Sequence, residues 1–366
     1  MPLPFIIAGA AAIAAGYGIK KGVDGYKSHS EADEIIKNTK DRYASQRNKF
    51  DTQETKTQSS LEQLGSLELD IGASFGQFST LADELLGKLN SGRQNKLNIN
   101  FPKHKLEKIE AYKFTALGVL GSVAGSGVAG VAAGFAVYGG VMTFAAASTG
   151  TAISALSGVA ATNATLAAIG GGAISAGGLG MAGGTAILGA AVAAPVLAIA
   201  GWAYANHGAE ALENAKKARR EANTAIEKLT LAAESLAKTE VYALKIRSSI
   251  TGIYSEFQKY FNQLKAISRR IDDCAELGLD PSDEINNLSP RILGTIENGY
   301  AMAAILTDII TTPLFKLKTN GNELIKDNNG IPVMDKDTDG SLILNSDSID
   351  SAIAQGSRDM QKFSPA

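Results

Sequence analysis

The side chains that most often do chemistry are few and scattered in this 366-residue chain. Its histidines are His29, His104 and His207, and they lie too far apart along the sequence to show the spacing of a metal site. Cys274 is the single cysteine, so no disulfide forms within the chain. We expect Cys274 to behave as a small apolar residue of a helix. The sequence therefore predicts a protein that is not an enzyme.

Two glycine-rich stretches match nucleotide-binding loops in their letters only. The stretch "GSVAGSG" at 121–127 lacks the Lys-Ser/Thr pair that completes a phosphate-binding loop. The stretch "GSGVAG" at Gly125–Gly130 fits the dinucleotide fingerprint, but neither a strand-helix-strand pattern nor a later acidic residue accompanies it. Because small residues also serve helix packing, we assign these glycines to packing and predict no bound cofactor.

A short acidic stretch near the C-terminus has the ligand types of a calcium site. In "DKDTDG" the carboxylates of Asp335, Asp337 and Asp339 alternate as in the first half of a calcium loop. The last ligand position of such a loop would be Ser346, where a glutamate belongs. Two interpretations stay open, a weak calcium site and a solvated turn rich in Asp, and the turn is favoured.

The most unusual feature of the sequence is a segment without charge. Between Lys113 and Glu210 only His207 can carry a charge near neutral pH, and we call residues 114–209 the charge-free segment. Alanine and glycine dominate it, and a glycine costs about 1 kcal/mol relative to alanine inside a helix in water. Small residues let helix backbones approach closely, and aromatic residues favour the membrane surface. The residues assigned to these two roles are Gly121, Gly125, Gly130, Gly134, Gly180, Gly184, Trp202 and Tyr204.

The charge-free segment has the length for several membrane crossings but only a weak drive to insert. One crossing takes about 20 residues, so the segment allows up to about four crossings or two long hairpins. Leu, Ile, Phe and Val each favour insertion by only about 0.3–0.6 kcal/mol, and the segment contains few of them. Such a marginal balance suits a segment that is hidden first and inserted later. It equally suits a hairpin that stays in the membrane within an oligomer.

The sequences on both sides of the charge-free segment predict long helices. The apolar positions from Ile250 to Cys274 recur about every 3.5 residues, the coiled-coil period, within a helix expected over 208–277. A further helix is expected from Ser289-Pro290 to about Thr311. We predict an all-α fold: a long helical bundle or coiled coil with a central apolar hairpin region and a short irregular C-terminal tail.

The predicted organisation has five parts. Residues 1–22 form an apolar N-terminal helix and candidate anchor, because apolar residues precede Lys20 and Lys21. The other parts are an amphipathic helical arm at 23–113, the membrane-active charge-free segment at 114–209, a long helix with a following helix at 210–318, and a polar tail at 319–366.

Part of the sequence resembles a known group of proteins. The run "NATLAAIGGGAISAGGLGMAGGTAILGA" and the start "MPLP", followed by "KKG", resemble bacterial glycine-zipper proteins over residues 1–28 and 155–205. That resemblance implies no established activity. Long helical arms around an apolar hairpin are also similar in architecture to α-helical pore-forming toxins, pore-forming colicins and type III translocators.

Three hypotheses for function follow. The first is a non-enzymatic protein that oligomerises and inserts glycine-zipper hairpins to form a pore or perturb a lipid bilayer. The second is a permanently membrane-anchored helical scaffold whose arms dock a partner complex, such as a dynamin-like or secretion-linked one. The third is a soluble bundle that buries the charge-free segment. We expect the protein to be membrane-associated in a bacterial cell, or soluble and able to convert to a membrane form. The net charge of −2 argues against nucleic acid as a partner.

Overall fold

The computed structural model describes residues 22–91, 94, 96–122, 132–137, 209–278, 280–321, 323–325, 332–338 and 342–363. Most of these residues are helical, and the predicted all-α class is confirmed. The predicted N-terminal helix lies outside the described residues apart from its last residue, and so do 123–131 and 138–208 of the charge-free segment. The labelled helices are α1 (Gly22–Asn90), α2 (Lys103–Ser122), α7 (Ala209–Glu276), α8 (Pro281–Ile310) and α9 (Ser346–Gln361).

The chain divides into two compact units. The first contains the described residues up to Asn48 of α1, together with α7 up to Leu229. Its buried core is built from small side chains, and Ala218 and Ala222 of α7 pack with Ile36 of α1. The second unit contains α1 from Lys49, α7 from Thr230, and the other labelled elements.

In the second unit, α1 and α7 each bury one stripe that repeats every seven residues. This repeat places two apolar positions per two helical turns on the same side of a helix, which is the pattern of a coiled coil. The repeat predicted for the end of α7 is confirmed by the buried Ile250, Phe257, Leu264 and Ile271. The corresponding buried positions of α1 form two series with this seven-residue repeat. One is Phe50, Thr57, Leu64, Ile71, Phe78 and Leu85, and the other is Leu61, Glu68, Phe75, Ala82 and Leu89.

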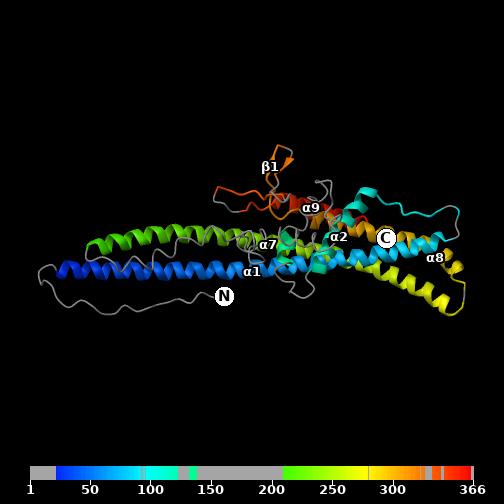
Figure 1. Ribbon diagram of the computed structural model, residues 1–366, viewed down its shortest axis with the longest axis horizontal. Helices are drawn as coiled ribbons and strands as arrows, with labels where there is room; N and C mark the ends of the chain where they lie inside the picture. Colours follow the sequence, from blue (N-terminus) through cyan, green and yellow to red (C-terminus); the bar gives the residue numbers. More distant parts are fainter. Residues whose placement is uncertain are drawn as a thin grey trace. The chain divides into compact units, whose positions relative to one another are not determined.

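These parts of α1 and α7 run parallel to each other (Figure 1). Partner positions advance together along both helices, which is the signature of a parallel pair. The hydrogen bonds that show this join Gln53 to Glu240 at 2.6 Å, Gln63 to Arg247 at 2.6 Å, Ser74 to Tyr254 at 2.7 Å and Lys88 to Asp272 at 2.9 Å.

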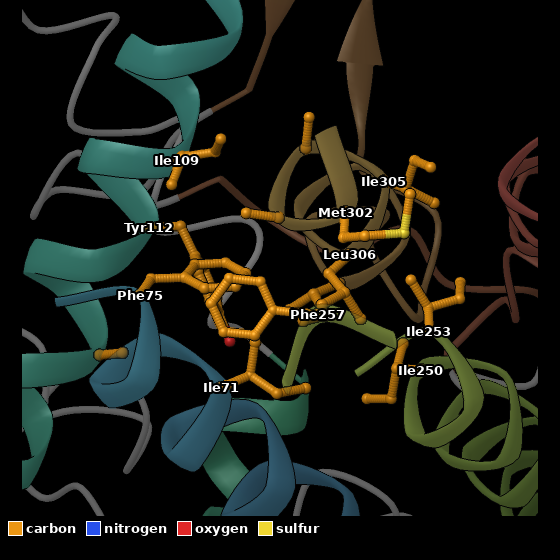
Figure 2. Close-up of a cluster of buried hydrophobic side chains, with 14 of the residues drawn as sticks. Ile71, Phe75, Ile109, Tyr112, Ile250, Ile253, Phe257, Met302, Ile305 and Leu306 are labelled. Atoms are coloured by element: carbon orange, nitrogen blue, oxygen red, sulfur yellow. The ribbon is translucent and has the colours of Figure 1, made fainter. Parts of the chain in front are cut away.

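The other helices of the second unit complete the bundle. α2 runs antiparallel to α1, and α8 returns along α7 after the turn at Gly278, whose φ of 72° favours glycine. Figure 2 shows their shared core, with Ile71 and Phe75 from α1, Ile109 and Tyr112 from α2, Ile250, Ile253 and Phe257 from α7, and Met302, Ile305 and Leu306 from α8.

The start predicted for α8 is wrong, although its predicted end is confirmed at Ile310. α8 begins at Pro281, because Asp280 caps it and the Asp280 carboxylate accepts a hydrogen bond from the Ser282 N–H at 2.9 Å. Pro290 lies inside the helix and cannot donate to the Asn286 carbonyl. The Ser289 hydroxyl donates to that carbonyl instead, at 2.6 Å, so a Ser-Pro pair that resembled a helix start is accommodated within one.

The C-terminal tail is more regular than predicted. The strands β1 (Thr319–Asn320) and β2 (Glu323–Leu324) form a small antiparallel pair, as a hairpin requires. The irregular tail predicted after it is wrong, because α9 follows at Ser346–Gln361. Gly356 brings α9 so close to α8 that a Cβ there would lie 2.7 Å from Ile309 Cδ1.

Candidate functional site at the start of the charge-free segment

α2 changes character where the charge-free segment begins. Its first part is charged, and Lys108 Nζ donates to Asp308 of α8 at 2.6 Å. From Phe114 onward the helix carries no charge, and the side chains of Phe114 and Leu117 are 53 % and 41 % exposed. A Cβ placed on Gly118 would meet nothing within 4 Å. With respect to the residues that the structure describes, one face of this part of α2 is therefore apolar and open.

The adjoining face of α2 packs on glycines of α1, and Leu117 lies at the edge between the two faces. We call Gly65, Gly72 and Gly76 the glycine seat. A Cβ on Gly72 would overlap the Cβ of Ala116, and a Cβ on Gly76 would lie 3.3 Å from Leu117 Cδ1. The helical segment at 132–137 is held in the same way, because a Cβ on Gly65 would overlap the backbone carbonyl of Ala132. Only residues without a side chain permit backbones this close.

A buried tyrosine and a buried glutamate lie beside the glycine seat. The Tyr112 hydroxyl donates to the backbone carbonyl of Glu68 at 2.5 Å. The Tyr112 ring also contacts Phe75 and Phe135, with ring centroids 6.0 Å and 6.2 Å away. Burial raises the pKa of the Glu68 carboxyl well above its usual value. Burial raises the pKa of Tyr112 as well, and the charge of Glu68 raises it further.

A polar cluster marks the last charged residues before Phe114. Lys113 Nζ lies 2.5 Å from Glu110 Oε2, and the Ser79 hydroxyl donates to Glu110 Oε1 at 3.3 Å. Burial and the neighbouring Glu110 raise the pKa of Asp83. Burial is also the main cause that raises the pKa of Tyr300 to about 12. The cluster fixes the charged end of α2 against the bundle and contains no arrangement typical of a catalytic site.

The sequence-predicted packing glycines are only partly described. Gly121 is exposed at the end of α2, where a Cβ would meet nothing within 4 Å. Gly134 is buried within the helical segment at 132–137. The remaining members of the predicted set lie outside the described residues, namely Gly125, Gly130, Gly180, Gly184, Trp202 and Tyr204.

Only two of the three predicted calcium ligands, Asp335 and Asp337, lie within the residues that the structure describes. Asp335 is half-buried, and its carboxylate accepts a hydrogen bond from the Lys336 N–H at 3.0 Å, whereas Asp337 is exposed. Asp339 lies outside the described residues. Within the residues that the structure describes, no group of three or more His, Cys, Asp or Glu side chains is placed to hold a metal ion. The calcium site stays a prediction.

Sequence reasoning missed the glycines that make the closest helix contacts. Gly72 and Gly76 are spaced as in the charge-free segment, but they lie in the amphipathic α1. Gly65 and Gly72 are seven residues apart, which places them on one side of a helix with a coiled-coil repeat. Glycines spaced with the seven-residue repeat of α1 could have indicated from the sequence that another helix packs closely there.

Comparison with known proteins leaves the family open. The chain matches no protein-family profile, no curated protein and no solved structure. The resemblance to bacterial glycine-zipper proteins therefore stays a prediction. Among the helices in the described ranges, none combines the length and the apolar character that a membrane crossing requires.

Proposed function

We propose that this protein is a non-enzymatic, membrane-acting protein that oligomerises and inserts its charge-free segment into a lipid bilayer. In this proposal α1, α7 and α8 form the bundle that carries the segment, and insertion opens a pore or perturbs the bilayer. The protein would then be membrane-associated, or soluble until it converts.

The observation that carries the proposal is the open apolar face at the start of the charge-free segment. Phe114 and Leu117 are large side chains exposed one turn apart on α2. Exposed apolar groups that lie together favour contact with a membrane or a partner. Lys113 precedes this face and keeps only 13 % of its side chain exposed. A bilayer that received residues from 114 onward would meet no Asp, Glu, Lys or Arg until Glu210.

Dye release from vesicles tests the proposal. Purified full-length protein is added to phosphatidylcholine–phosphatidylglycerol vesicles that contain a self-quenching dye, and we expect release that increases with protein concentration. Leu117→Asp should reduce the release, because a charged side chain on an inserted helix opposes insertion, by up to about 2.5–3.5 kcal/mol at the helix centre and by less near its start. The matched control is Leu244→Asp on α7, since Leu244 is 42 % exposed and lies outside the charge-free segment.

The outcomes separate the hypotheses. Vesicles that stay intact at saturating wild-type protein would contradict the pore-forming and bilayer-perturbing function. Firm binding to intact vesicles that only detergent reverses would favour the membrane-anchored scaffold instead. Equal loss of release in Leu117→Asp and Leu244→Asp would show that the charge-free segment has no special part in release.

A further inference from the structure

We propose that the glycine seat of α1 is an intramolecular latch, which holds the first part of the charge-free segment on the bundle and releases it toward a bilayer. This inference rests on the proposed function, and it names how the same segment would be controlled. The latch consists of Gly65, Gly72 and Gly76 with the residues that they receive, Ala116 and Ala132.

The first argument is the closeness of the fit. A methyl group on Gly72 would overlap Ala116, and one on Gly65 would overlap the Ala132 backbone. A backbone cannot yield as the end of a flexible side chain does, so even alanine in the seat would displace the segment. Elsewhere on α1, Gly87 has nothing within 4 Å of an added Cβ. Among the glycines of α1 from Gly65 to Gly87, the close fit therefore occurs where the charge-free segment lies.

The second argument is that the segment is held by small groups and on one side. The fully buried residues of α2 beyond Phe114 are Ala116 and Val119, whereas Phe114 and Leu117 are open. Separation of α2 beyond Phe114 would thus expose little apolar surface that is not already exposed, whereas separation of 132–137 would also expose Phe135, which is fully buried beside Tyr112. Van der Waals contacts at close range hold such an interface, and they vanish with a small displacement.

The third argument is that the start of α2 is fastened independently. Lys108 pairs with Asp308 of α8, and Lys113 pairs with Glu110 and contacts Ser79 at 3.5 Å. The Tyr112 hydroxyl binds the backbone of α1 at Glu68. These contacts all precede Phe114. The glycine seat touches both parts of α2, since an added Cβ on Gly72 would lie 3.5 Å from Tyr112 Cε1. Only the start of α2 has these polar contacts, so release of the continuation requires the continuous helix α2 to bend at a hinge near Lys113–Phe114.

The latch is tested first without lipid. Amide hydrogen exchange is measured for residues 114–122 and 132–137 in the full-length chain carrying Gly65→Ala or Gly72→Ala. We expect exchange there to rise by about tenfold, because the added methyl group lifts the segment from the seat. Gly87→Ala on α1 and Gly252→Ala on α7 are matched controls, since an added Cβ meets nothing within 4 Å at either position. We expect no change in these ranges for the controls.

A reversible disulfide between α1 and α2 supplies a second test, which does not require that the protein fold with Gly65→Ala or Gly72→Ala. Leu117 Cδ1 lies 3.3 Å from an ideal Cβ on Gly76, so the two residues are neighbours, and formation of a disulfide between cysteines at these positions is verified by mass spectrometry before the assay. The variant Gly76→Cys/Leu117→Cys is made with Cys274→Ser and oxidised. We expect dye release from the vesicles described above to fall about tenfold and to return when a reductant is added.

The outcomes distinguish the latch from the proposed function. Unchanged exchange in both seat variants would overturn the latch, as would an oxidised double-cysteine variant that releases dye as fast as the reduced protein. Raised exchange together with faster release in the seat variants supports it. If wild-type and reduced proteins release no dye, the proposed function fails, and the exchange measurement alone decides whether the seat holds the segment.

Discussion

Two contact regions of the second unit use opposite side-chain sizes. The aromatic core brings Phe75 and Phe78 of α1 against Phe257 of α7, with both ring centroids 5.2 Å from that of Phe257. Phe78 also meets the Tyr300 ring of α8 edge-on at 5.2 Å. The glycine seat, on the same helix α1, replaces side chains with bare backbone. Large rings hold three helices in one region, and the absence of side chains admits a fourth segment in the other.

The difference distinguishes contacts that stabilise the fold from contacts that allow two helix backbones to lie close together. Burial of apolar surface contributes about 25 cal/mol per Å², so the aromatic rings contribute far more free energy than glycine or alanine. Edge-to-face ring pairs add about 0.5–1.5 kcal/mol. A glycine contributes no side-chain burial, but it sets how near two backbones lie. The aromatic core should therefore resist separation, and the glycine seat should be the region that opens.

The largest effect is expected from Phe257→Ala. Phe257 is fully buried and contacts Phe75, Phe78 and Phe261, so its loss leaves a cavity between helices. We expect the free energy of unfolding in urea to fall by about 3–5 kcal/mol. Phe363→Ala is the control, because Phe363 is 38 % exposed, and it should change stability by less than about 0.5 kcal/mol. Equal losses would contradict the assignment of stability to the aromatic core.

A glycine in the aromatic core gives the next effect. A Cβ on Gly299 would overlap the Phe78 ring, so Gly299→Ala should destabilise the protein by about 1–3 kcal/mol. Gly294→Ala, on the same helix, meets nothing within 4 Å and should stabilise it by up to about 1 kcal/mol. Thermal and urea unfolding of both variants measure the difference. Stabilisation in both variants would mean that the Phe78 ring moves aside without cost.

From the sequence, the buried side of each long helix could be predicted more successfully than the close contacts between helices. The repeat at Ile250 and Phe257 follows from apolar spacing alone, because side chains seven residues apart share one face of a helix. Spacing could place Gly65 and Gly72 on one side of α1, but it could not give their partners, since Ala116 is set against Gly72 by tertiary structure. α9 was missed because Ser and Asp are frequent in it, although its buried Ile349 lies on an apolar face.

A smaller, pH-dependent effect on stability is expected from Glu68, beside the glycine seat. The pKa of Glu68 is raised by burial in the folded protein, so the folded state binds a proton where the unfolded state has lost it. The contribution of Glu68 to stability should therefore be most favourable below the unfolded pKa, about 4.3, and should fall as pH rises toward and through the raised folded pKa. Glu68→Gln removes this dependence and should stabilise the protein by roughly 1–2 kcal/mol at the higher pH.

Urea unfolding of wild type and Glu68→Gln at a series of pH values checks this expectation. The gain of the variant over wild type should grow with pH. Asp70→Asn, an exposed change on the same helix, is the control and should show a difference from wild type that does not follow this trend. A constant gain for Glu68→Gln at all pH values would show that the Glu68 carboxyl does not titrate differently in the folded state.

The smallest effect is expected from Tyr112→Phe, which keeps the ring and removes one hydrogen bond beside the seat. The lost bond joins the Tyr112 hydroxyl to the Glu68 carbonyl at 2.5 Å, and a buried bond of this kind contributes about 0.5–1.5 kcal/mol. Because this bond fastens α2 before the hinge, amide exchange should rise in the start of α2 as well as beyond Phe114. Gly72→Ala should raise it mainly beyond Phe114, because the added Cβ overlaps Ala116 but lies at an ordinary contact distance of 3.5 Å from Tyr112 Cε1. If both variants raised exchange over the same residues, α2 would leave α1 as one piece, and the fastened start and the seated continuation would be a single contact region.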